Sequence, residues 1–385
     1  MKNDQVLIAV DSLMMGGIQK SLLAFLQYIK NFCDIDIVVW HDRWPEMVEL
    51  PAYVNRIHVT GTESVRSAYK SYGAFSKDFL VSAFATFREK RWLGLPRIEK
   101  NYDIAIAYSH VSSLKYYIID KVSAKKKYAF FHHGAYDFDD QTRRFDSEYY
   151  PQYDKVFAAS PDARKVLLEA MPGLDNVSVI PNLIDIESIK ESGKEPCPEY
   201  PDDQRLKLLT VGRLSPEKNP LRIIEMAKLL NEKKVEFIWL IVGDGKLRDA
   251  IENGIRKNQL EGKVVLTGNQ ENPYKFMSRC VFYLQFSLYE ADPVTIREVA
   301  VFNKMMILSG IPGFRQCHDI FRNIFLTDSN AEVVRLILQL KNDAIDKNDL
   351  DIVNHEIFRI IDREIFEMAK QRRLMGIKGE LDEKA

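Results

Sequence analysis

The sequence predicts an α/β protein built from two domains, each with a doubly wound parallel sheet. At 385 residues the chain is longer than a single hydrophobic core usually serves, so two domains are expected. Short apolar runs alternate with helical patterns in both halves, which is typical of parallel sheets covered by helices. The alternation stops at a polar stretch with three prolines and resumes at Leu206. We therefore expect an N-terminal domain over residues 1–190, a linker over 191–205 and a C-terminal domain over 206–350.

The composition is that of a soluble globular protein with balanced charge. Apolar residues make up 46% of the chain and charged residues 28%, and the net charge is −1. This balance gives no general reason to expect nucleic acid as a partner. The four cysteines lie far apart, which argues against a zinc knuckle or a redox pair and favours reduced thiols in a cytoplasmic protein. The N-terminus lacks a signal-peptide pattern, and no apolar run is long enough to span a bilayer.

The first half opens with a buried strand, a glycine loop and a helix. Residues 5–10 form a mostly apolar run, and Gly16 and Gly17 precede a helical pattern that reaches Ile29. Glycines let a ligand approach the backbone, and a helix N-terminus favours a phosphate. The glycine spacing fits neither a dinucleotide fingerprint nor a P-loop, so a plain tight turn is the alternative.

A segment rich in aromatic and basic residues interrupts this half. Further strands are expected at residues 35–40, 104–108, 128–131, 155–159 and 177–180. Between the first two of these strands, residues 65–100 place aromatic side chains among lysines and arginines. This combination suits peripheral contact with an anionic membrane surface. A basic helix pair that packs its aromatic side chains into the core is the alternative.

Two histidines follow one of the predicted strands. His132 and His133 come directly after the strand at 128–131, so at least one imidazole is expected at the carboxyl edge of the sheet, where open α/β sheets bind ligands. We favour a histidine that hydrogen-bonds a substrate, with His132 ahead of His133, because a metal pair lacks a further ligand nearby. Asp137 and Asp139 form a D-x-D triplet of the kind that holds a divalent metal in some enzymes, but two other such triplets weaken that signal.

The second half repeats the pattern of strand, glycine-containing turn and helix. A strand at 206–211 leads into the loop GRLSPEKNP, where Arg213 and Lys218 could donate charged hydrogen bonds to a diphosphate. Two solvated loop cations are the alternative. Strands follow at 237–242 and 264–266. The Gly-Asp-Gly-Lys run after the first of these lacks P-loop spacing and is interpreted as a turn.

Residues 283–312 are expected to form a buried strand, a loop, a short helix and a second buried strand. Asp292 is a good N-cap and Pro293 suits the first helical position, so a helix should run from Pro293 to about Phe302. Its first turn would leave the backbone N–H groups of Val294 to Ile296 free to meet an anion.

Two carboxylates flank this helix start. Glu290 lies in the loop and Glu298 inside the helix, so both could face a ligand held there. Solvated loop and helix charges are the alternative. The chain then gives a short strand at 324–326, helices at 331–340 and from 350 to about 374, and a polar tail.

Five sequence blocks together resemble glycosyltransferase family 4. In the family's order they are the glycine loop at Gly16 and Gly17, VIPNLID, GRLSPEKNP, VGDGKLRDAI and SLYEADPVTIREVA. The resemblance implies a GT-B fold, in which two Rossmann-like domains face a central cleft and a C-terminal helix, within 351–385, crosses back to the first domain. It also implies sugar transfer from a nucleotide-sugar donor with retention of anomeric configuration. Neither a metal nor another cofactor is implied.

The resemblance implies roles for particular residues. Arg213 and Lys218 would bind the donor diphosphate and stabilise the departing nucleotide, Glu290 would face the donor sugar, and Glu298 would hold the ribose hydroxyls. The anion site would be completed by backbone N–H groups near Gly16 and Gly17 and at Val294 and Thr295. His132, with a register uncertain by one because of His133, would lie beside the sugar.

The chain departs from the family pattern near the first carboxylate. Ala291 and Asp292 replace a glycine and an apolar or aromatic residue, and Asn303 and Met305 replace a glycine and a proline. A carboxylate at 292 would repel a diphosphate unless it turns back to cap its helix.

The expected function is that of a metal-independent hexosyltransferase in cell-surface polysaccharide synthesis. The donor would be a nucleotide sugar, UDP-linked in preference to GDP-linked, and the acceptor a glycan or lipid-linked sugar. The protein would act in the cytoplasm, at the inner face of the membrane. Two alternatives stay open: a nucleotide-sugar epimerase of the same fold, and a non-catalytic partner that keeps the fold without donor binding.

Overall fold

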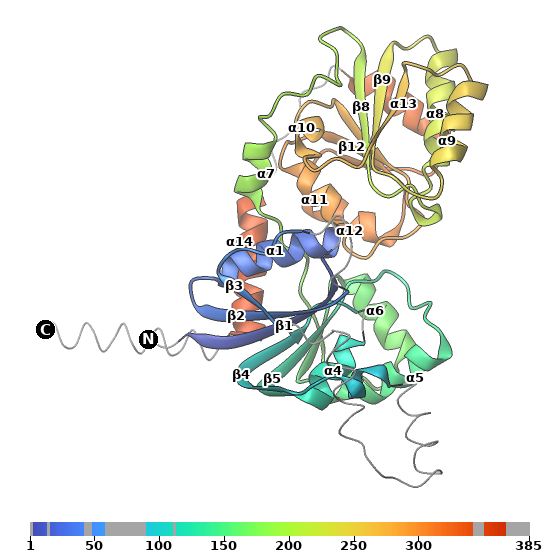
Figure 1. Ribbon diagram of the computed structural model, residues 1–385. Coiled ribbons are helices and arrows are strands. Elements are labelled where there is room, and N and C mark those ends of the chain that lie inside the picture. Colours follow the sequence, from blue (N-terminus) through green and yellow to red (C-terminus); the bar gives the residue numbers. More distant parts are fainter. Residues whose placement is uncertain are drawn as a thin grey trace, which may run out of the picture. The chain divides into compact units, whose positions relative to one another are not determined.

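The chain folds into two compact α/β units (Figure 1). The computed structural model describes residues 3–13, 16–41, 48–57, 90–110, 113–341 and 350–366. The first unit is formed by two segments of the chain, one up to Leu183 and one from Glu356 onward. The second unit is formed by Ile184–His355. Each unit has a parallel sheet with helices on both faces, so the predicted pair of doubly wound sheets is confirmed.

The described residues of the first unit form one sheet of seven parallel strands. Its order is β3-β2-β1-β4-β5-β6-β7. The strands are β1 (Asp4–Ser12), β2 (Cys33–His41), β3 (Val54–Ile57), β4 (Ile98–Ala107), β5 (Val122–Phe131), β6 (Lys155–Ala158) and β7 (Val177–Val179). The helices are α1 (Gly17–Ile29), η1 (Arg91–Gly94), α4 (Leu114–Lys121), α5 (Asp140–Tyr149), η2 (Tyr150–Gln152), α6 (Pro161–Ala170) and the second half of α14 (Leu350–Glu364).

Helices cover both faces of this first sheet (Figure 1). On one face α1 packs against α14, where the rings of Tyr28 and Phe358 stack with centroids 4.2 Å apart. On the other face Trp92 is buried against Tyr116 of α4 and Phe145 of α5, at 4.6 and 5.2 Å between centroids. The apolar sides of these helices therefore close a core above and below the sheet.

The described residues of the second unit form a sheet of six parallel strands. Its order is β10-β9-β8-β11-β12-β13. The strands are β8 (Leu206–Val211), β9 (Phe237–Val242), β10 (Val264–Gly268), β11 (Phe282–Gln285), β12 (Met305–Leu308) and β13 (Ile324–Leu326). The helices are α7 (Ile186–Ser192), η3 (Pro216–Lys218), α8 (Leu221–Glu232), α9 (Arg248–Lys257), α10 (Tyr274–Met277), α11 (Val294–Ala300), α12 (Pro312–Ile320) and α13 (Asn330–Leu340).

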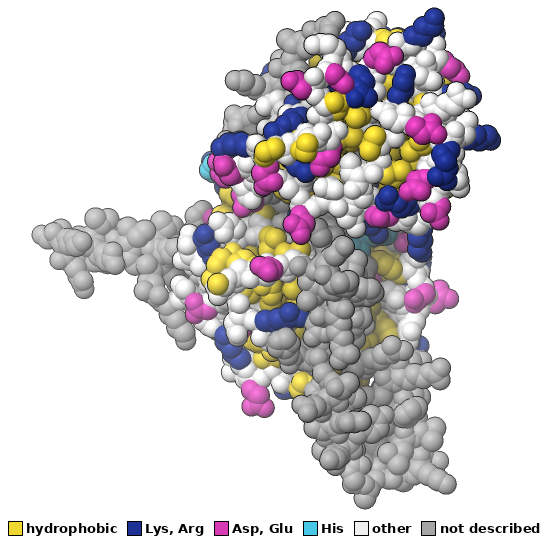
Figure 2. Space-filling view, turned by 45° about the horizontal axis from the view of Figure 1, so that its top comes forward, with side chains coloured by type: hydrophobic (Ala, Val, Ile, Leu, Met, Phe, Trp, Pro, Cys, Tyr) yellow, Lys and Arg dark blue, Asp and Glu magenta, His cyan; other side chains and the backbone are white. Residues whose placement is uncertain are grey.

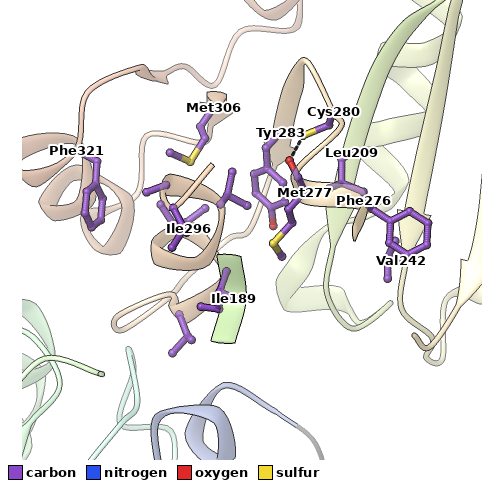
Figure 3. Packing of buried hydrophobic residues seen from close by; sticks show 14 of the residues in the cluster. Ile189, Leu209, Val242, Phe276, Met277, Cys280, Tyr283, Ile296, Met306 and Phe321 are labelled. Carbon is purple, nitrogen blue, oxygen red and sulfur yellow. Dashed lines mark hydrogen bonds between the residues drawn. The ribbon is translucent and has the colours of Figure 1, made fainter. Parts of the chain in front are cut away.

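Two apolar clusters lie on opposite faces of the second sheet. The cluster in Figure 3 joins α7, α10, α11 and α12 to one face, with Ile296, Tyr283 and Met306 among its members. The other joins α8, α9 and α13 to the opposite face. Strand β9 is buried at every position because its alternate side chains enter the two clusters in turn.

The structure differs from the prediction at residues 191–205, the expected linker. The division between the units falls earlier in the chain, at Leu183, and this segment packs into the second unit. Cys197 and Tyr200 are 8% and 6% exposed within the cluster on the α11 side, and the Tyr200 hydroxyl donates to the Leu208 carbonyl at 2.8 Å. These contacts hold a stretch whose polar, proline-rich composition indicates a free connection.

Charged and edge strands also differ from the prediction. Strand β3 and the first half of β5 are not anticipated by the apolar pattern. In β5, Lys125 and Lys126 pair with Asp103 and Asp154, each at 2.6 Å. Because these positions are exposed and occupied by charged side chains, they carry no apolar periodicity. Figure 2 shows acidic and basic side chains interspersed over the described surface in that view, in keeping with the net charge of −1.

Candidate active site

A pocket lies where the second sheet changes its direction of strand order. Strand β8 pairs with β9 on one side and with β11 on the other, so later strands are added to the sheet on both sides of β8. Open α/β sheets bind ligands at the carboxyl ends of the strands at such a point. The pocket is lined by Thr210, Val211, Gly212, Arg213, Leu214, Lys218, Pro220 and Gln285. It therefore includes both cations of the GRLSPEK loop.

The wall of this pocket is supported by the glycine turn that follows β9. The Gly212 N–H donates to the Val242 carbonyl and the Leu214 N–H to the Asp244 carbonyl, both at 2.9 Å. Gly243 has φ 137°, and a Cβ there would lie 2.0 Å from the Gly212 carbonyl oxygen. Only glycine fits this close approach. The Gly-Asp-Gly-Lys run is thus a turn that shapes the pocket.

The backbone around Lys218 is fixed by the loops on either side. The Lys218 N–H donates to the Ser215 carbonyl at 3.0 Å, which closes η3. The neighbouring Glu217 carbonyl accepts from the Leu288 N–H at 2.8 Å. Asn219 then takes a left-handed conformation, with φ 49°. The loop after β8 is therefore joined by a backbone hydrogen bond to the loop after β11.

The Lys218 ammonium forms an ion pair with the Glu290 carboxylate. The same oxygen, Oε1, accepts from Gln285 Nε2 and from Ser287 Oγ, each at 2.8 Å. The Lys218 and Glu290 side chains are only 21% and 12% exposed, so the pair is largely shielded from solvent. An anion that enters the pocket would meet a cation already held in place, which is the arrangement that electrostatic catalysis requires.

Polar side chains at alternate positions of β11 and its continuation orient Glu290. Tyr283, Gln285 and Ser287 project to the same side of the strand. The Tyr283 hydroxyl donates to Gln285 Oε1 at 2.6 Å, so the Gln285 NH₂ group is left to donate to Ser287 Oγ and to Glu290. These residues are not among those predicted from the sequence. Their signal is a polar side chain at every second position of a buried strand.

Arg213 borders the same pocket but is held more loosely. Its side chain is 77% exposed, and Nη2 lies 3.2 Å from Glu217 Oε1. Burial alone would raise the pKa of Glu217, but hydrogen bonds and the charges of Arg213 and Lys218 outweigh it and lower the pKa. An exposed ion pair of this kind constrains a side chain weakly. Arg213 can therefore turn toward a ligand.

Asp292 does not cap α11, and the prediction that it does so is wrong. The helix begins at Val294 with Pro293 at the N-cap position and without a side-chain cap. The Asp292 carboxylate, 0% exposed, accepts instead from Arg297, with Nε and Nη2 at 3.0 and 2.9 Å from Oδ1. The Asp292 charge outweighs the effect of burial and raises the pKa of Arg297. The carboxylate is thus compensated inside the protein.

The first turn of α11 has fewer free backbone N–H groups than predicted. The Ile296 N–H donates to the Pro293 carbonyl at 3.0 Å, so the prediction that it stays free is wrong. Val294 and Thr295 are the first two residues of the helix; Val294 is buried and Thr295 is half-buried. Their amides are the part of the predicted anion site that the helix start can still supply.

Glu298 is buried beneath the predicted anion site. It is 2% exposed and accepts from the Tyr274 hydroxyl at 2.8 Å. Burial, reinforced by the Glu298 charge, raises the pKa of Tyr274, so the phenol stays protonated and keeps donating. Within the described residues, Glu298 is not part of the pocket lining. The structure therefore places Arg213 and Lys218 at one pocket, with Glu290 paired to Lys218, and places Glu298 in a separate polar contact.

In the first unit, the predicted glycine loop follows β1. Gly16 is the N-cap residue of α1 with extended backbone (φ −169°), and Gly17 is the first helical residue. Strand β1 lies between β2 and β4, so the loop stands where the strand order of the first sheet changes direction. This is the same topological position as the pocket of the second sheet.

His132 and His133 follow β5 and have different surroundings. The His132 ring stacks on Phe130 with centroids 5.6 Å apart and 11° between the planes. His133 Nδ1 lies within hydrogen-bonding distance of the Ala135 carbonyl and 3.8 Å from Asp137 Oδ1. His133 therefore interacts with residues of the turn that follows it.

A third histidine, which the sequence analysis did not identify, supports this edge. His110 is 3% exposed, and its Nδ1 accepts from the His132 backbone N–H at 3.4 Å. Burial, together with the nearby charges of His132, His133 and Lys115, lowers the pKa of His110 well below its usual value. No sequence motif marks His110, because it meets His132 only through the pairing of β4 with β5.

The D-x-D triplet serves the start of α5. Asp139 is the N-cap residue, and its Oδ1 accepts from the Thr142 N–H at 2.7 Å. Asp137 is exposed beside His133. Among the described residues, no three His, Cys, Asp or Glu side chains are grouped so that they could hold a metal ion.

Most of the segment predicted to contact a membrane, residues 65–89 of 65–100, lies outside the described residues. In its described remainder, Trp92 is buried in the core and Lys90 pairs with Glu148 at 3.0 Å. This part follows the alternative in which the aromatic side chains enter the core. Among the described helices, none is both long enough and apolar enough to cross a bilayer.

Comparison with known proteins gives partial matches in sequence. Residues 197–353 match the family described as "Glycosyl transferases group 1". An uncharacterized glycosyltransferase of Methanocaldococcus jannaschii is 26% identical over 163 residues, which cover 41% of this chain and 40% of that protein. The N-acetylgalactosamine-N,N'-diacetylbacillosaminyl-diphospho-undecaprenol 4-alpha-N-acetylgalactosaminyltransferase of Campylobacter jejuni is 32% identical over 151 residues, 37% of either chain. The alignments thus span well under half of these relatives.

The likeness in structure extends over nearly the whole chain. The Anabaena protein HepE, solved in complex with UDP-glucose, superposes with a TM-score of 0.68 at 13% identity, over 94% of this chain and 100% of that chain. At this identity the likeness concerns the fold. Together with the two parallel-sheet units, it confirms that the chain has the predicted GT-B fold.

Proposed function

We propose that the protein is a retaining, metal-independent glycosyltransferase that uses a nucleotide-sugar donor, UDP-linked in preference to GDP-linked. The observation that carries this proposal is the Lys218–Glu290 pair in the pocket at the switch point of the second sheet. The match of residues 197–353 to group 1 glycosyl transferases and the likeness to a protein that holds UDP-glucose support it.

The donor diphosphate would bind to the two cations of the GRLSPEK loop. As the bond between the sugar and the diphosphate breaks, its electron pair stays with the leaving nucleoside diphosphate. Lys218, held in place by Glu290, and Arg213, free to turn inward, would stabilise that charge. Such preorganised donors are worth about a hundred- to a thousandfold in rate.

The remaining predicted residues would bind other parts of the donor. Glu298 would accept from the ribose hydroxyls, and Glu290 would face the sugar. The amides of Val294 and Thr295, and those near Gly16 and Gly17, would complete the anion site. His132 would lie beside the sugar. This last set of roles rests on the resemblance to glycosyltransferase family 4.

The acceptor would be a glycan or lipid-linked sugar of cell-surface polysaccharide synthesis. The name of the Campylobacter relative specifies a diphospho-undecaprenol acceptor, and this supports the acceptor class. We place the protein at the cytoplasmic face of the membrane for the same reason. Salt-sensitive flotation of the purified protein with anionic liposomes tests this placement, and the absence of binding at low salt would contradict it.

A two-step experiment tests the activity. A thermal-shift screen against UDP-, GDP- and other nucleotide sugars should identify one donor that raises the melting temperature. Incubation of that donor with polyprenyl-diphosphate-linked sugars should then yield a glycosylated product, whose anomeric configuration NMR compares with that of the donor. Full activity is expected in EDTA, whereas strict dependence on manganese would contradict metal independence.

The same experiment distinguishes the alternatives. A nucleotide-sugar epimerase would convert the donor to its epimer without an acceptor. A non-catalytic partner would give neither product nor a thermal shift. Lys218→Met should abolish the shift, and Lys233→Met, at an exposed lysine after α8, should leave it unchanged.

A further inference from the structure

The loop that carries Glu290 is attached to the protein at several points. Gln316 of α12 donates to the Ala291 carbonyl at 2.7 Å. Gly313, on the same helix, lies so close that a Cβ would be 2.3 Å from the Glu290 carbonyl oxygen. On its other side the loop is attached to α11 through Asp292 and Arg297. Glu290 is therefore held by contacts that lie outside the pocket.

The Asp292–Arg297 pair is the most deeply buried of these contacts. The two side chains are 0% and 4% exposed, and two guanidinium nitrogens donate to the same carboxylate oxygen. The guanidinium also lies 5.8 Å from the ring centroid of Phe321. Buried ion pairs contribute little net stability compared with apolar residues of the same size, but they favour one geometry strongly.

We infer that the Asp292–Arg297 pair is a positioning device of the donor site, which fixes the Glu290 loop onto α11 and so holds the Lys218 ammonium in place. The effect of the pair on catalysis rests on the proposed function. Its effect on Lys218 rests on the contacts alone. Asp292 is two residues from Glu290, and Glu290 Oε1 is the acceptor for Lys218. A shift of the loop would therefore reach the cation directly.

The pair also accounts for an acidic residue beside a predicted diphosphate site. An uncompensated carboxylate at this position would repel the donor. Because Arg297 accompanies Asp292 inside the protein, the two charges cancel, and Asp292 adds no net negative charge beside Lys218 and Arg213. Arg297 thus acts through position and charge without contacting the donor.

The first test measures Lys218 itself and needs no substrate. Amine labelling followed by peptide mass spectrometry gives the reaction rate of Lys218, with the exposed Lys233 as internal reference. In Arg297→Met, the Lys218 rate should rise about fivefold, the factor that corresponds to a loss of about 1 kcal/mol from its ion pair with Glu290. In Arg297→Lys, which keeps the charge, the labelling rate of Lys218 should lie between those of Arg297→Met and the wild type.

Arg297→Met leaves a buried, uncompensated carboxylate and can unfold the unit, so a second variant is needed. The double variant Asp292→Asn with Arg297→Gln removes both charges, so that no uncompensated carboxylate is left in the interior. It should fold and still label faster at Lys218. In transfer assays its kcat/KM should fall about ten- to a hundredfold, as expected for a small misplacement of a catalytic group.

The outcomes separate this inference from the proposed function. If the folded variants keep the wild-type Lys218 rate, donor affinity and kcat/KM while their melting temperature falls, the pair is merely structural and the inference is overturned. A wild-type protein that binds no nucleotide sugar would contradict the proposed function, whereas the labelling rates would still decide the role of the pair.

Discussion

The Lys218 ammonium and the Glu290 carboxylate, 72 residues apart in the sequence, form an ion pair at the carboxyl edge of the second sheet. They meet because β8 and β11 are neighbours in that sheet, so the loops that follow them are adjacent. Gln285 and Ser287 hold the same carboxylate oxygen. A cation that is already positioned loses little freedom when an anion binds, which favours both affinity and catalysis.

Replacement of Lys218 by methionine should reduce turnover about a hundred- to a thousandfold, because a preorganised donor to the diphosphate is lost. The fold should remain intact, since Glu290 keeps its bonds to Gln285 and Ser287. Calorimetric titration with the donor found in the thermal-shift screen measures the affinity, and a coupled assay measures kcat/KM. The matched control is Lys233→Met; wild-type affinity in the Lys218 variant would remove this residue from the site.

Replacement of Glu298 by glutamine separates the charge of this residue from its structural contact. Glutamine retains an acceptor for the Tyr274 hydroxyl, so the melting temperature should change little. Glu298→Ala should instead destabilise the protein by about 1–3 kcal/mol, because the buried hydroxyl loses its partner. Donor affinity should fall in Glu298→Gln because a charged acceptor for the ribose is lost.

Discrimination between nucleotides gives the decisive measurement for Glu298. The wild type should prefer UDP to its 2′,3′-dideoxy analogue, and Glu298→Gln should lose most of that preference. An unchanged preference in the variant would contradict a role of Glu298 in ribose binding.

Apolar strands made the fold predictable from the sequence. Strands such as β8 and β9 follow the predicted ranges because each is a short, largely apolar run that ends at a glycine. The first half of β5 carries three lysines, two of which pair with carboxylates at the surface, and it gives little apolar signal. Periodicity therefore identifies buried strand segments and misses exposed ones.

The sequence predicts candidate residues of the site but not the contacts between them. Lys218 and Glu290 are both among these candidates, yet their pairing depends on strand order, which local sequence does not specify. Asp292 carries the local signal of an N-cap, but a buried guanidinium five residues later provides a stronger partner. That spacing is not one of the usual helix-neighbour spacings, so helical periodicity does not indicate the pair.

Replacement of Gly313 by alanine should disturb the Glu290 loop from the side of α12. The new Cβ would lie 2.3 Å from the Glu290 carbonyl oxygen, so the loop or the helix must move. We expect a loss of about 1–3 kcal/mol in the free energy of unfolding, as for other overpacked sites, and faster amine labelling of Lys218. His318→Ala, at an exposed position of the same helix, is the control. Wild-type labelling in Gly313→Ala would mean that the loop absorbs the methyl group without moving Glu290.

The first unit should lose stability as the pH falls below about 6.5, because His110 is buried in its neutral form. Its pKa is lowered by burial and by the charges of His132, His133 and Lys115, so below the ordinary histidine pKa the unfolded chain binds a proton that the folded chain does not. Stability therefore rises with pH in this window, by up to about 1.4 kcal/mol per pH unit for one such group.

His110→Asn tests this origin of the pH dependence, since the asparagine oxygen can still accept from the His132 N–H. Hydrogen exchange of peptides from β4 and β5, measured by mass spectrometry at pH 7, 6 and 5, reports the opening of the first unit. The wild type should exchange faster as the pH falls, after correction for the intrinsic rate, and the variant should show a flatter dependence. An identical slope in both proteins would assign the pH dependence to other groups.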